Sequence, residues 1–84
     1  MIKRVNAELN LLYMYAYELA DGLGVLEDET VVEYLTACAE IVELGNAMAK
    51  KPSAYSEEEI LEELDAIATM AQSMVELVDT LANM

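Results

Sequence analysis

Apolar residues recur along this chain at alternating intervals of four and three positions, in three long stretches. This spacing places the apolar side chains on one face of an α-helix. It predicts helices over about residues 2–21, 29–50 and 57–82. The repeating positions are Val5, Leu9, Leu12, Ala16, Leu19 and Leu23, then Val31, Leu35, Cys38, Val42, Gly45 and Ala49, then Leu64, Ile67, Ala71, Met74, Val78 and Leu81.

Residues that start and stop helices support these boundaries. Gly22 and Gly24 close the first stretch, and Pro52 closes the second, because neither residue type continues a helix well. The stretch from Tyr13 to Tyr17 alternates like a strand, but its flanks favour a helix and a solitary strand has no pairing partner. The expected start signals are an N-cap at Asp28 or Thr30 and a capping box formed by Ser56 with Glu59.

Short connections favour helices that fold back on each other. We therefore expect one all-α domain over residues 1–84, an antiparallel three-helix bundle. Its apolar faces are wide: that of the second helix spans roughly 220–240° of arc, whereas a helix packed on one side needs about 100–140°. Either a tight monomer or a subunit interface could cover the excess, and we expect oligomerisation, with a homodimer favoured. The self-association candidates are Leu44, Met48, Met70 and Leu77.

Three positions interrupt the apolar faces. Gly45 lies within a helical repeat, where it is expected to allow close helix contact rather than a break. Glu8 falls in the apolar sector of the first helix, one turn after Arg4, so a partly buried ion pair or a salt contact between subunits is expected. Glu63 intrudes on the apolar edge of the third helix.

The charge of the chain limits its partners. The chain has seventeen Asp and Glu residues and only four Lys and Arg residues, which gives a net charge of −13. This charge disfavours direct binding to nucleic acid or anionic lipid. No stretch approaches the ~20 apolar residues of a membrane span, and no signal peptide is visible. The lone Cys38 is expected to be a buried thiol, so the chain needs no oxidising compartment and a cytoplasmic location is expected.

Candidate chemistry is sparse. The chain has no His, which removes the commonest general base and a common metal ligand, so no cofactor and no catalytic residue are expected. Acid pairs one helical turn apart could share a hard cation such as Mg²⁺, although a solvated polar face is the better explanation of them. These pairs are Glu40 with Glu43 and Glu62 with Asp65.

One local stretch is similar to a known family. Residues 8–24, ELNLLYMYAYELADGLG, resemble the third-helix segment of MazG-like all-α nucleoside triphosphate pyrophosphohydrolases. The resemblance implies an α-helical, oligomeric protein, in a family that uses Mg²⁺ held by carboxylates. The family's Glu-x-x-Asp signature falls on Glu8 and Leu11, so the metal-binding Asp is replaced and the activity is not carried over.

Three functions are therefore weighed. The first is a non-enzymatic protein–protein interaction protein: a small acidic adaptor, inhibitor or assembly subunit. The second is a phage-type nucleic-acid mimic of the anti-restriction or anti-CRISPR class, which occupies a basic groove on a protein. The third is a Mg²⁺-dependent nucleotide pyrophosphohydrolase-like protein. The candidate partner-binding residues are Tyr13 and Tyr17, which could also be core edge or oligomer contacts, and Glu57, Glu58, Glu59 and Glu62.

Overall fold

The computed structural model describes all 84 residues and consists of helices joined by short turns. Helix α1 spans Ile2–Leu23, α2 spans Glu29–Lys50 and α3 spans Glu57–Ala82, with a short 3-10 helix, η1, at Pro52–Ala54. No strand is present, so the all-α class and the three helices are confirmed. Helix α1 is two residues longer than expected because it continues through Gly22 to Leu23.

The helix ends show which of the predicted signals operate. Gly24 ends α1 with a φ of +72°, a left-handed conformation that costs glycine little. Asp28 rather than Thr30 caps α2, because its Oδ1 accepts hydrogen bonds from the backbone N–H groups of Thr30 and Val31 at 3.0 and 3.3 Å. At α3, Glu59 N–H donates to Ser56 Oγ at 3.1 Å, and Ser56 N–H donates back to Glu59 Oε1 at 2.8 Å. This capping box is the predicted one.

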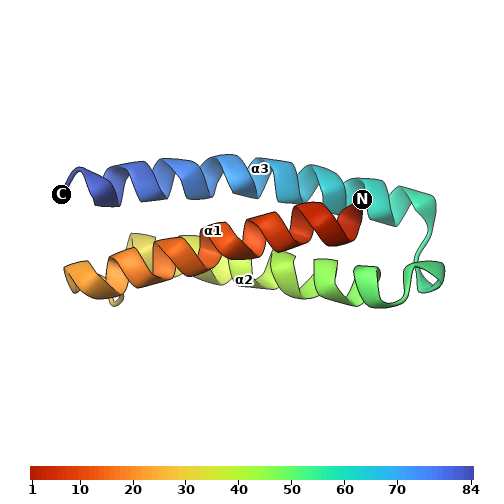
Figure 1. Cartoon of the computed structure of the whole chain (residues 1–84), viewed down its shortest axis with the longest axis horizontal. Helices are drawn as coiled ribbons and strands as arrows, with labels where there is room; N and C mark the ends of the chain where they lie inside the picture. The colour runs from red at the N-terminus through yellow and green to blue at the C-terminus, as the bar shows by residue number, and fades with distance from the viewer.

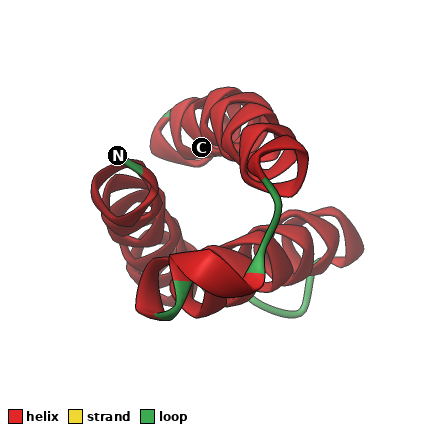
Figure 2. Ribbon diagram, turned by 90° about the vertical axis from the view of Figure 1, so that its right-hand side faces the viewer, coloured by secondary structure: helices red, strands yellow, loops and turns green.

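The three helices lie side by side along a rod of 43 × 19 × 17 Å. In Figure 1 the chain runs leftward along α1, returns along α2 and runs leftward again along α3. Figure 2 looks along the rod and shows the three helices at the corners of a triangle. Each helix therefore has two neighbours, which is how the bundle covers apolar faces wider than a single contact requires. None of the helices combines the length and apolar content that a bilayer crossing demands.

The core runs the length of this triangle and absorbs most of the expected subunit surface. Met48, Met70 and Leu77 are buried by the chain's own helices, whereas Leu44 remains exposed on α2. Of the four residues expected to mediate self-association, only Leu44 is free for such a contact in this structure. The largest fully buried side chains are Leu9, Met74, Asn6 and Cys38.

A polar contact fixes α1 against α2. The buried Asn6 Nδ2 donates to the backbone carbonyl of Val42 at 3.1 Å and to Asn46 Oδ1 at 2.9 Å. A Cβ at position 45 would collide with the Asn6 side chain, so Gly45 is what lets the amide reach α2. This agrees with the close approach predicted at Gly45. Because the amide has few alternative partners in the core, it favours one alignment of the two helices.

The two acids expected in apolar surroundings differ in environment. Arg4 and Glu8 do form an ion pair at 3.8 Å, but their side chains are 86% and 65% exposed, so the expected partial burial is wrong. Helix α1 turns this side outward, past the edge of its contact with α3. Glu63, in contrast, is buried, and its Oε2 atom has no hydrogen-bond partner. Burial raises the pKa of the Glu63 carboxyl above its usual value.

Candidate protein-interaction site

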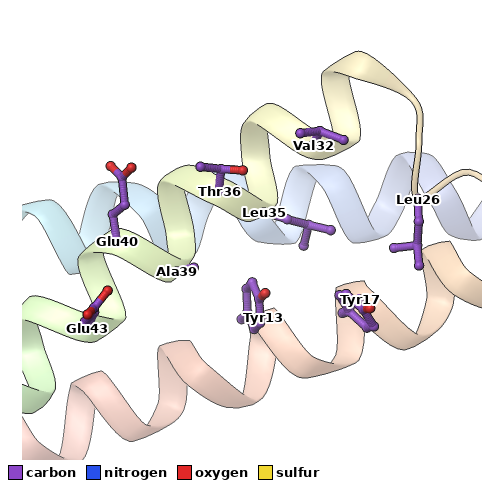
Figure 3. Close-up of a pocket in the computed structure, with 9 residues that line it drawn as sticks. All are labelled: Tyr13, Tyr17, Leu26, Val32, Leu35, Thr36, Ala39, Glu40 and Glu43. Atoms are coloured by element: carbon purple, nitrogen blue, oxygen red, sulfur yellow. The ribbon is translucent and has the colours of Figure 1, made fainter.

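Tyr13 and Tyr17 stand one helical turn apart on the side of α1 that faces α2. Their ring centroids are 6.3 Å apart and the ring planes are inclined by 34°. They form one wall of a groove of about 400 Å³ between the two helices, called here the tyrosine groove (Figure 3). The remaining lining residues come from α2 and the preceding turn: Leu26, Val32, Leu35, Thr36, Ala39, Glu40 and Glu43.

The tyrosine groove is apolar along most of its length and acidic at one end. Leu26 lies at one end, and Glu40 and Glu43 lie at the other (Figure 3). Both carboxylates are exposed, and neither has a basic partner, because Arg4–Glu8 is the only ion pair in the structure. Such a groove can accept apolar side chains against the rings and a Lys or Arg at the acidic end.

Charge is divided unequally between the two halves of the rod. All four basic residues, Lys3, Arg4, Lys50 and Lys51, lie in the half that contains the start of α1, the end of α2 and the start of α3, called here the mixed half. Glu57, Glu58, Glu59 and Glu62 are exposed in the same half. The opposite, acidic half has no basic residue and contains Glu18, Asp21, Glu27, Asp28, Glu29, Glu33, Glu76 and Asp79.

The carboxylates expected to share a cation do not form a site. No group of three or more His, Cys, Asp or Glu side chains lies close enough together to hold a metal ion. Glu40 belongs to the end of the tyrosine groove, whereas Glu62 and Asp65 are exposed on α3. A helical spacing of three positions brings two acids together on one helix, but the packing of α2 on α3 does not unite the two pairs.

Cys38 lies in the core, as expected. Its side chain is fully buried, and burial raises the pKa of its thiol to about 11. Because the thiolate is the reactive form, this thiol is protonated at neutral pH and shielded from solvent. Cys38 therefore acts as a small apolar core residue.

Four of the exposed apolar residues that were not singled out from the sequence lie on α1 and α3. Leu11, Tyr15, Leu61 and Val75 are between 54% and 66% exposed. A pattern in the sequence does mark three of them. Each helix has a central stretch without any charged residue, and these stretches contain Leu11, Tyr15 and Val75. These stretches, called here the uncharged middle, are residues 9–17, 34–39 and 66–75.

Comparisons with known proteins add no relative. No protein-family model, curated protein or solved structure matches the chain. The resemblance of residues 8–24 to MazG-like proteins stays a prediction.

Proposed function

We propose that this chain is a non-enzymatic protein–protein interaction module, an acidic antiparallel three-helix bundle that binds a segment of a partner protein in the tyrosine groove. The observation that carries the proposal is the pair of tyrosine rings facing an apolar floor, with two unpaired carboxylates at one end. Tyrosine contributes a large contact area at a low cost in side-chain entropy, which is why it is enriched in binding hot spots.

The groove also defines the partner. Apolar anchors would pack between Tyr17 and Leu35, and a Lys or Arg would lie near Glu40 and Glu43. The net charge of −13 favours the approach of a basic partner and opposes that of an acidic one. We therefore expect an amphipathic segment with apolar residues followed by a basic residue. An adaptor, an inhibitor or an assembly subunit would each use such a contact.

The test compares wild type with Tyr17→Ala in affinity capture from native cells, followed by calorimetry with the captured protein. Tyr17 is exposed, so its truncation leaves the core intact, and loss of one ring should weaken binding by at least about tenfold. Tyr15→Ala is the matched control, because Tyr15 is an exposed tyrosine of the same helix outside the groove.

Equal capture by wild type and Tyr17→Ala would exclude this groove as the binding site. The salt dependence of binding distinguishes the nucleic-acid mimic from the interaction module. Groove binding should persist between 50 and 500 mM NaCl, because most of its contact is apolar, whereas mimicry of a nucleic acid depends on charge and should collapse. A complex that dissociates with salt and is indifferent to Tyr17→Ala would favour the mimic.

A further inference from the structure

A second groove lies on the other side of α1, where this helix meets α3. It has a volume of about 260 Å³ and is called here the alanine groove, after the small residues on its α3 side. Ala68 and Ala71 leave room above the backbone of α3, so that the groove can receive side chains from outside. Its lining is Val5, Glu8, Leu9, Leu12, Leu64, Ile67, Ala68 and Ala71.

Exposed apolar side chains flank the alanine groove on both helices. Leu11 and Tyr15 lie three residues after Glu8 and Leu12 on α1, and residues at this spacing are neighbours on a helix surface. On α3, Leu61 lies one turn before Leu64, and Val75 lies one turn after Ala71. All four are more than half exposed, so the groove and its rims form a mainly apolar face along the rod, interrupted by Glu8.

We propose that a second copy of this chain covers the alanine groove, in a two-fold dimer whose rods run in opposite directions. The inference is independent of the proposed function, because the tyrosine groove lies on the α2 side of α1 and stays open in such a dimer.

The exposed area fits this occupant. A compact monomer of 9.3 kDa has a surface of about 5,000 Å², whereas this rod exposes 5665 Å². One side of a rod 43 Å long and 19 Å wide offers about 800 Å², which is the area that each partner buries in a standard interface. The side of the rod that carries the alanine groove is therefore large enough for a standard interface with a second copy.

The distribution of charge along the rod favours one direction for the second copy. The uncharged middle of α1 and that of α3 lie level with each other, since Leu12 and Ala71 line the same groove. A two-fold axis through this region places no like charges at the centre of the interface. Opposite directions then bring the acidic half of each copy beside the mixed half of the other, which holds Arg4 on α1, whereas parallel rods would place two acidic halves together.

Sedimentation velocity on the full chain, from about 1 to 500 μM, tests for the dimer. We expect a reversible dimer that strengthens between 50 and 500 mM NaCl, because salt screens the repulsion between two chains that each carry −13. A monomer at every concentration and salt level would overturn the proposal and leave this face to a different protein.

Substitutions then locate the interface. Tyr15→Glu and Val75→Glu should each raise the dimer dissociation constant by at least about tenfold, because each places a like charge beside the partner. Leu44→Glu is the matched control, since Leu44 is an exposed apolar residue of α2 that lines neither groove. Circular dichroism checks that each variant is helical. A dimer that tolerates both groove variants would use another face.

Disulfide trapping tests the direction. Arg4 lies one turn before Glu8, and Asp79 lies one turn after Val75, so they mark opposite ends of the same face. Mixing Arg4→Cys with Asp79→Cys should give a disulfide between the two variants under mild oxidation, with little bonding within either variant alone. Pairing of position 4 with position 4 would show parallel rods and overturn the proposed arrangement.

Discussion

Glu63 is the only carboxylate in the core, and its burial has a definite effect on stability. Its Oε2 atom has no partner, and burial raises its pKa above the ordinary value. A raised pKa in the folded state means that the folded protein binds the proton more tightly than the unfolded chain does. The stability that Glu63 contributes is therefore full below its unfolded pKa and is lost as the pH rises through the folded pKa.

Glu63→Gln should stabilise the protein at neutral pH by about 1 kcal/mol, because an amide of the same shape replaces a buried charge. Its gain in stability on acidification from pH 7 to pH 5 should be smaller than that of wild type. Urea unfolding at several pH values measures both effects. Glu62→Gln removes the same charge from an exposed neighbour, and equal behaviour of the two variants would contradict the role of burial.

Asn6 and Gly45 form a size-matched pair, and their substitutions should not be additive. Gly45→Ala alone should cost about 2 kcal/mol, because the new Cβ collides with the Asn6 side chain. In an Asn6→Ala background that obstacle is absent, and alanine also favours the helix over glycine by up to about 1 kcal/mol. A double-mutant cycle by chemical denaturation should show coupling of at least about 1.5 kcal/mol. If the two changes in the free energy of unfolding were simply additive, α1 and α2 would be able to move apart and accommodate the new Cβ.

At the scale of the helices, the start of α3 depends on the capping box of Ser56 and Glu59. Ser56→Ala should lower the free energy of unfolding by about 1 kcal/mol, because it removes the hydrogen bond from Glu59 N–H to Ser56 Oγ. Thermal unfolding followed by circular dichroism measures the change. Ser53→Ala, in η1, should change stability by much less, since Ser53 is exposed and is not the N-cap of a helix. A similar loss from both variants would count against the cap.

The helices were predictable because their signals are local. Apolar spacing and the Ser56–Glu59 pattern lie within a few residues of the elements that they specify, and all three helices form where expected, with only α1 longer. The capping choice between Asp28 and Thr30 depends on one turn of backbone geometry, which composition alone does not specify. Burial of Met48, Met70 and Leu77 depends on how far each helix rotates toward two neighbours, so their surface role was overestimated.

The site was predictable only in part, for the same reason. Tyr13 and Tyr17 were recognisable as neighbours at a spacing of four positions. Their groove requires Leu26 and Val32 from other segments, and no pattern within α1 specifies those partners. Glu8 was expected to be partly buried because it falls in the apolar sector of α1, whereas the bundle leaves one edge of that sector open to solvent.

At the scale of the whole molecule, the excess of negative charge is concentrated where no basic residue relieves it. The acidic half contains the ends of α1 and α3, and neither helix has a basic residue in its last turn. The partial negative charge at those helix ends adds to the carboxylates nearby. Repulsion should therefore destabilise this half more than the mixed half, where all four basic residues lie.

Asp21→Lys should raise the free energy of unfolding by about 0.5–1 kcal/mol at low salt, because it places a cation in the last turn of α1. The gain should shrink in 0.5 M NaCl. Glu58→Lys makes the same change of net charge in the first turn of α3, where a cation opposes the helix dipole, so it should give no gain. Equal stabilisation by both variants, measured by urea unfolding, would show that only net charge matters.

The unequal halves also make the single rod behave as a polar particle. Its centre of negative charge is displaced along the 43 Å axis from the end that holds all four basic residues. A monomer should therefore turn in an applied field and meet a cationic surface with its acidic end first. Two copies in opposite directions would cancel this moment, so electric birefringence should weaken as the concentration rises and the dimer forms.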